Sequence, residues 1–142
     1  MAKIERSITI NAPVDKVFSY INDPMNALEY MPSITDIRDV TGLDVGDRCG
    51  WTYKMLGIPL KGEQEVIERI PNQRLVTKGT GAVLSTWTYT FKPEAGGTSL
   101  HSVLEYTIPV PVLGKFGERL VLRWNERDAD LAMANIKERM EG

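Results

Sequence analysis

The chain has 142 residues, with 17 Lys and Arg against 19 Asp and Glu and a formal net charge of −2. This balance disfavours nucleic acid and anionic membranes as partners, because both attract proteins with clustered positive charge. The single cysteine excludes an internal disulfide framework, and no apolar run has the length of a signal peptide or a membrane span. We therefore expect one domain over residues 1–142, cytoplasmic and without integral membrane association.

The chain begins with a strand and two short helices. Residues 4–10 predict a half-buried strand, because three isoleucines fall on one face of an alternating pattern. A helix follows from Pro13, since proline is tolerated in a first helical turn. Its apolar residues recur at helical spacing and are Val14, Val17, Phe18 and Ile21. Pro24 ends this helix, and residues 25–31 predict a second short one.

Strand and turn patterns fill the middle of the chain. The expected strands are residues 34–40, 48–55, 63–70, 74–78, 86–91 and 98–107. Most of them are joined by short turns rich in glycine, proline or asparagine, which is typical of hairpins. Together with the first strand they make seven. An antiparallel sheet with one solvated face is the simplest arrangement of such strands.

A long helix is expected over residues 118–141, at roughly 36 Å for the usual rise per residue. Helical spacing gives it one apolar stripe, made of Val121, Leu122, Ala129, Ala132, Met133, Ile136 and Met140. Two polar residues, Glu118 and Asn125, fall inside the same stripe. We expect this stripe to face the sheet, with the alanines allowing a close approach.

Several segments together resemble a known family. They are APVDKVFSYINDPMNALEYMPSI, VGDRCGWTY, GEQEVIERIPNQRLV, EYTIPVPVLGKF and NIKERME. The chain is similar over its whole length to the polyketide cyclase/dehydrase-like branch of the START-related superfamily, the SRPBCC proteins that include the major birch pollen allergen. The resemblance implies an α+β helix-grip fold, in which a seven-stranded antiparallel sheet wraps around a long carboxy-terminal helix and encloses a cavity. Two short helices would lie between strands 1 and 2. Members include ligand carriers, aromatase/cyclases, hormone receptors and co-chaperone-like activators, so the fold leaves the function open.

Aromatic side chains on the helix side of the sheet are the candidate cavity lining. The predicted ligand-binding residues are Trp51, Tyr53, Trp87, Tyr89, Tyr106 and Asn125. Their hydroxyl, indole and amide groups need hydrogen-bond partners when buried, and a cavity holding a ligand would provide them. The alternative is that they form an ordinary aromatic core.

Catalytic motifs are few. The only histidine, His101, alternates out of phase with the inward residues of its strand and should face solvent. No metal-ligand spacing or phosphate-binding loop occurs, so we expect no metal and no cofactor. Glu118 and Asn125 are weak catalytic candidates, because a carboxylate in a dry pocket could act as acid or base toward an enolisable ketone. For Glu118 the pattern favours the alternative, a solvated carboxylate at a helix start. An internal ion pair between Arg6 and Glu68 is a further expectation.

A second apolar set lies on the opposite side of the helical wheel and consists of Leu113, Phe116, Leu120, Trp124 and Leu131. An exposed face of this kind indicates a partner, a homodimer or a lid over a pocket. Bending at Gly114 and Gly117 would instead bury the first two residues and leave the others to be covered.

Three functions follow as hypotheses. The first is the binding of a small hydrophobic ligand, lipid-like or polyketide-like, in an internal cavity between the sheet and the long helix. The second is catalysis by a cyclase or dehydratase without a metal or nucleotide cofactor. The third is a protein-interaction or homodimer module that uses the Trp124–Leu131 helix face. The residues favour binding over catalysis.

Overall fold

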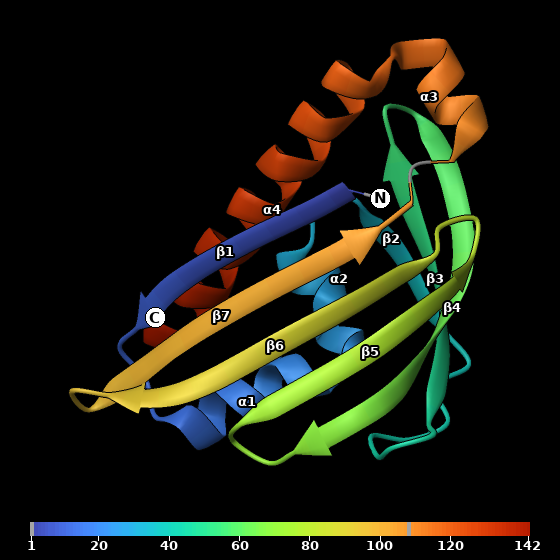
Figure 1. Ribbon diagram of the computed structural model, residues 1–142. Helices are drawn as coiled ribbons and strands as arrows, with labels where there is room; N and C mark the ends of the chain where they lie inside the picture. The colour runs from blue at the N-terminus through green and yellow to red at the C-terminus, as the bar shows by residue number, and fades with distance from the viewer. Residues whose placement is uncertain (1, 108) are drawn as a thin grey trace.

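The computed structural model describes residues 2–107 and 109–142 (Figure 1). Its strands are β1 Ala2–Ile10, β2 Ile34–Arg38, β3 Arg48–Met55, β4 Ile58–Ile70, β5 Arg74–Gly81, β6 Ser85–Glu94 and β7 Gly97–Tyr106. Its helices are α1 Val14–Asn22, the 3₁₀ turn η1 Pro24–Asn26, α2 Ala27–Tyr30, α3 Val110–Phe116 and α4 Glu118–Glu141.

The strands form one antiparallel sheet in the order β1-β7-β6-β5-β4-β3-β2. Strands β2 to β7 are neighbours in chain order, and the last strand, β7, also pairs with the first strand, β1. The sheet is strongly curved, and α1, α2 and α4 lie on the same side of it (Figure 1). The predicted helix-grip arrangement, with two short helices between β1 and β2, is therefore confirmed.

The inward face of α4 packs on the sheet through the apolar stripe that the sequence predicts. Ala132, Met133, Ile136 and Met140 are buried and share one cluster with α1, α2 and the centre of the sheet. Phe18 of α1 meets Phe91 of β6 edge-on, with ring centroids 5.1 Å apart. Burial of these side chains supplies the main force that holds the helix against the strands.

Polar contacts fix α4 along the outer edge of β1. Arg6 Nε donates to Asp130 Oδ1 at 2.6 Å, and Lys137 Nζ donates to the Thr9 carbonyl at 2.8 Å. At the carboxyl end, the Asn11 amide donates to Glu141 Oε2 at 2.7 Å. The bond from Lys137 satisfies one backbone carbonyl of the strand edge, and α4 covers that edge, which protects it from pairing with another chain.

The helical region after β7 differs from the prediction. A separate helix, α3, precedes α4, and Gly117 between them has φ 81° and ψ 153°. This backbone conformation is accessible to glycine at little cost, so the chain changes direction there. Residues before and after Gly117 therefore do not share one helical wheel.

Strand β4 begins five residues earlier than expected, at Ile58. The turn before it is formed by Leu56 and Gly57, both at positive φ.

Within the described residues, none of the helices combines the length and apolarity needed to span a bilayer.

Candidate functional site

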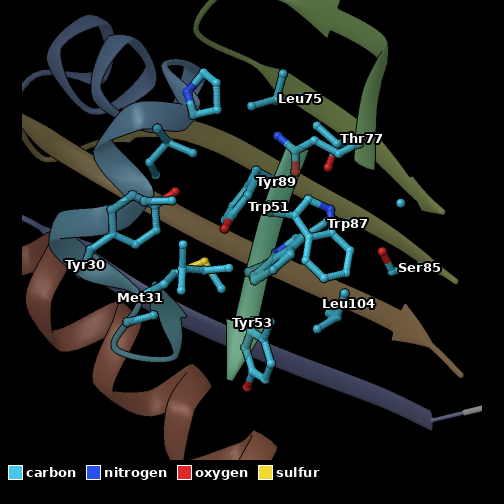
Figure 2. Close-up of a pocket in the computed structure, with 18 of the residues that line it drawn as sticks. Tyr30, Met31, Trp51, Tyr53, Leu75, Thr77, Ser85, Trp87, Tyr89 and Leu104 are labelled. Carbon is cyan, nitrogen blue, oxygen red and sulfur yellow. The ribbon is translucent and has the colours of Figure 1, made fainter. Parts of the chain in front are cut away.

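A pocket of about 170 Å³ lies between the sheet and α4. Its walls come from all seven strands and from α1, α2 and α4, and most of its surface is apolar. Figure 2 shows Trp51, Trp87 and Tyr89 meeting in its centre, with Tyr30 of α2 opposite them. All six residues predicted to line a cavity border this pocket: Trp51, Tyr53, Trp87, Tyr89, Tyr106 and Asn125.

The aromatic wall is held in place by stacking and hydrogen bonding. The rings of Trp87 and Tyr89 stack with centroids 5.5 Å apart and planes inclined by 16°. Trp87 Nε1 donates to Ser102 Oγ on the neighbouring strand at 2.8 Å. Because the indole is satisfied within the sheet, it offers the pocket a flat apolar surface.

Five polar side chains meet on the α4 side of the pocket, and we call them the polar cluster: Ser33, Tyr53, Tyr106, Asn125 and Asp128. Ser33 Oγ donates to Asp128 Oδ1 at 2.7 Å, and the Tyr53 hydroxyl donates to Asp128 Oδ2 at 3.0 Å. The Tyr53 hydroxyl also lies 3.4 Å from Asn125 Oδ1. Asn125 Nδ2 donates to the Tyr106 oxygen at 2.6 Å. Figure 2 shows the Tyr53 hydroxyl directed toward α4.

Burial shifts the acidity of the ionisable groups around the pocket. Desolvation raises the pKa of Tyr53 and of Tyr106 above the usual tyrosine value. It also raises the pKa of Tyr30 to about 12 and that of Tyr89 well above its ordinary range. Burial raises the pKa of the Asp128 carboxyl, while the hydrogen bonds from Ser33 and Tyr53 oppose that shift. The phenols therefore stay protonated and can donate hydrogen bonds at neutral pH.

The sequence patterns do not predict Tyr30, Ser33 or Asp128 as site residues, and Asp128 is the only one of them that carries a charge. Its side chain is 7% exposed and borders the pocket. A signal was present, because Asp128 falls three residues after Asn125 and four before Ala132, on the same face of the helix. Aspartate is seldom fully buried, so its place on the inward face does not by itself predict a site residue.

The prediction that Glu118 faces inward is wrong. Glu118 is exposed as the first residue of α4 and does not border the pocket. Glu118 is at the free end of the helix, whereas Val121, on the same stripe one turn later, is buried in one cluster with Met55 and Leu60 of the sheet.

The expected Arg6–Glu68 ion pair does not form. Arg6 is bonded to Asp130 on α4, whereas Glu68 receives a hydrogen bond from Arg74 at 3.1 Å. Arg6 is on an edge strand and Glu68 is on β4, well inside the sheet, so other partners are nearer to each.

The prediction of an exposed apolar face around Trp124 is also wrong in part. Leu120 and Leu131 are exposed as predicted, but Trp124 packs in a second cluster with Met55, Leu60, Val112 and Val121. Helix α3 supplies Phe116 to this cluster, because the chain turns back at Gly117. The Trp124 indole Nε1 is buried without a hydrogen-bond partner among the described residues.

Replacement of Trp124 by phenylalanine should change the free energy of unfolding by less than about 1 kcal/mol, because the lost ring area is offset by removal of an unsatisfied N–H. Trp87→Phe is the matched control and should cost about 1 kcal/mol more, since it also breaks the bond to Ser102. Urea denaturation of both variants measures the difference. A larger loss for Trp124→Phe would show that its indole N–H has a partner in solution.

The outer face of the sheet carries a hydrogen-bonded Ser, His and Glu set. His101 Nδ1 lies 2.5 Å from Ser7 Oγ, and His101 Nε2 lies 2.8 Å from Glu5 Oε2. None of the three borders the pocket, and His101 is partly exposed, as the strand alternation predicts. This arrangement links β1 to β7 on the solvent side and is not part of the candidate site.

Cys49 borders the pocket as a buried thiol, and burial raises its pKa to about 11. A thiol with a raised pKa is a weak nucleophile. Over residues 2–107 and 109–142, no three His, Cys, Asp or Glu side chains group together in a way that could hold a metal ion.

One known protein family matches almost the whole chain. The family described as polyketide cyclase / dehydrase and lipid transport matches residues 1–141. The chain belongs to this family. No curated protein matches it significantly. The predicted resemblance to the polyketide cyclase/dehydrase-like SRPBCC proteins is therefore confirmed.

Solved structures of similar shape are numerous. The protein TTHA0849 from Thermus thermophilus is 20% identical, with 98% of this chain and 97% of that one covered at a TM-score of 0.83. The di-domain ARO/CYC StfQ from the steffimycin biosynthetic pathway is 15% identical, with 98% of this chain and 50% of that one covered at 0.77. The Aha1 dimer from Colwellia psychrerythraea is 14% identical, with 99% and 97% covered at 0.66. At these identities the likeness to each solved structure shows the fold alone.

Proposed function

We propose that this protein binds one small, largely apolar molecule that carries an oxygen function. The observation that supports this most is the pocket itself, which combines an aromatic wall with a polar cluster on one side only. Ligand sites are typically apolar with a few placed polar groups that fix orientation. The family description, which includes lipid transport and polyketide cyclases, is consistent with such a ligand.

The size of the pocket limits the ligand. Its volume of about 170 Å³ is close to that of a cavity of about 150 Å³ that holds benzene. Sites for drug-sized ligands start at about 300 Å³. We therefore propose a ligand of one or two rings, or a short branched chain. A long acyl chain or a multi-ring polyketide would require the pocket to widen.

Within the polar cluster, Tyr106 can donate a hydrogen bond to a ligand. Its side chain is 3% exposed and borders the pocket, and its oxygen already accepts from Asn125. No hydrogen bond donated by Tyr106 occurs among the residues that the structure describes. A phenol has one proton to donate, so that proton is available to a ligand oxygen.

Binding is tested with a matched pair of probes, 2-indanone and indane, which differ by one carbonyl group. We expect wild-type protein to bind 2-indanone more tightly than indane, because Tyr106 donates to the carbonyl. Tyr106→Phe should weaken binding of 2-indanone roughly three- to tenfold, equal to the loss of one hydrogen bond, and leave indane unchanged. Titration calorimetry measures the affinities, and Trp51 and Trp87 should report binding through their fluorescence.

Two further variants control this experiment. Tyr20 does not border the pocket, and its hydroxyl donates to Glu29 Oε1 at 2.8 Å. Tyr20→Phe removes this hydroxyl and should leave the affinities for both probes unchanged. Ala129→Phe places a ring in the pocket from α4 and should abolish binding of both probes while circular dichroism shows a folded protein. Equal binding by wild type and Ala129→Phe would contradict an internal site.

The interaction hypothesis has less support. Leu120 and Leu131 remain exposed on α4, but Trp124, which stands between them on the predicted face, is packed in the second cluster. A dimer is known for the Aha1 protein of Colwellia psychrerythraea, at 14% identity. We therefore place ligand binding first.

A further inference from the structure

A buried carboxyl group borders the pocket, and no basic side chain of residues 2–107 or 109–142 forms an ion pair with it. Asp128 is 7% exposed, and within the described residues its hydrogen-bond donors are the neutral hydroxyls of Ser33 and Tyr53 and the backbone N–H of Ser33. Arg6, a basic side chain that also borders the pocket, is bonded to Asp130 at 2.6 Å and lies 3.9 Å from Glu126. Buried charges in proteins are normally paired, so an unpaired one is costly for the fold.

The carboxylate keeps capacity for a further bond. Each of its oxygens can accept about two hydrogen bonds, and Oδ2 has only the Tyr53 hydroxyl at 3.0 Å among the described side chains. Ser33 and Tyr53 hold the group in a fixed orientation beside the pocket. Its position on α4, a long helix packed on the sheet, adds rigidity to that orientation.

We propose that Asp128 is a general base that removes a proton from the carbon next to the carbonyl group of a bound ketone or related carbonyl compound, and that Tyr106 donates a hydrogen bond to the carbonyl oxygen. This proposal rests on the proposed function, since it requires the ligand to occupy the pocket. It names the substrate class as small carbonyl compounds with an acidic α hydrogen.

The step balances within the site. The α C–H bond breaks, and its proton passes to Asp128 Oδ2. The electron pair of that bond forms a carbon–carbon double bond, and the carbonyl oxygen takes up the negative charge as an enolate. The Tyr106 hydroxyl stabilises this charge, as preorganised donors do at oxyanions. Return of the proton from Asp128 regenerates the ketone, so no oxidant or further reactant is required.

The test measures exchange of the α hydrogens of 2-indanone for deuterium in D₂O, followed by proton NMR. Wild-type protein should catalyse exchange that saturates with the ketone. Asp128→Asn has nearly the same shape and should slow the protein-dependent exchange about tenfold or more, in line with the usual contribution of a general base. Glu118→Gln, on the same helix but exposed and outside the pocket, is the control and should exchange at the wild-type rate.

The rate should also depend on pH in a defined sense. The carboxylate form of Asp128 is the base, so exchange rises as pH rises through its pKa, and the midpoint should lie above the ordinary aspartate value. The groups that face Asp128 are Ser33, Tyr53 and Asn125, with Tyr106 and Arg6 beyond them. Both phenols stay protonated at neutral pH, so this rise belongs to Asp128.

Three outcomes decide the matter. Loss of exchange in Asp128→Asn, with wild-type affinity for 2-indanone and a melting temperature no lower than that of the wild type, supports the proposal. Wild-type exchange by Asp128→Asn, or binding of 2-indanone by the wild type without exchange, overturns the base while leaving the binding function intact. If 2-indanone does not bind the wild type at all, both fall. Tyr106→Phe provides a second variant and should slow exchange severalfold at saturating ketone.

Discussion

Replacement of Ile136 by alanine is expected to lower the free energy of unfolding by about 3 kcal/mol. Ile136 is 1% exposed and lies at the centre of the contact between α4 and the sheet. Truncation removes three buried carbons and leaves a void that the surrounding sheet cannot close, since α4 is fixed to β1 on both sides of it. The cost should appear in urea denaturation followed by far-ultraviolet circular dichroism.

Leu131→Ala is the matched control on the same helix. Leu131 is 40% exposed, so its truncation should cost less than about 1 kcal/mol. If the two variants were equally destabilised, Leu131 would be covered in solution, and the homodimer hypothesis would regain support. Sedimentation of the wild type at the same concentration would then identify the partner copy.

Replacement of Gly62 by alanine should cost about 2 kcal/mol of unfolding free energy or more, as overpacking usually does. A Cβ at this position would overlap both the backbone carbonyl oxygen of Thr80 and the ring of Trp51. The carbonyl belongs to the neighbouring strand β5 and cannot move without breaking the ladder. The ring must therefore move, and it borders the pocket.

The same substitution should alter the pocket. Because Trp51 pairs with Gly62 across β3 and β4, its displaced ring would enter the ligand space. We expect weaker binding of both indane and 2-indanone, together with a shifted tryptophan emission. Gly114→Ala is the control, since a Cβ there meets nothing within 4 Å. It lies in α3 and should leave stability unchanged or raise it by up to about 1 kcal/mol. A stable Gly62→Ala variant would mean that the sheet is less rigid than these contacts indicate.

The aromatic wall of the pocket could be predicted because strands alternate with a period of two. Trp51 and Tyr53 on β3, and Trp87 and Tyr89 on β6, each fall on the helix side through that alternation alone. A continuous strand keeps its two faces distinct over its whole length. Asn125 could be placed by the helical period for the same reason.

Glu118 and Trp124 lie within α4, and the helical period alone does not show which other element covers each face of that helix. Only three-dimensional packing shows that Gly117 separates two helices and that α3 folds back over Trp124. A glycine within an apolar pattern is compatible with either a continuous or a broken helix. The chain adopts the broken form if burial of Phe116 and Val112 in the second cluster lowers the free energy more than the hydrogen bonds of a continuous helix would.

The sequence by itself determined the order of the elements, the buried stripe of α4 and the aromatic face of the sheet, because these follow from local periodicity and from proline and glycine positions. Only the tertiary structure decided that Asp128, Tyr53 and Tyr106 meet at one side of a pocket. They come from α4, β3 and β7, and contacts among residues so distant in the chain depend on sheet curvature and on the angle at which the helix crosses it. Local patterns carry no information about either.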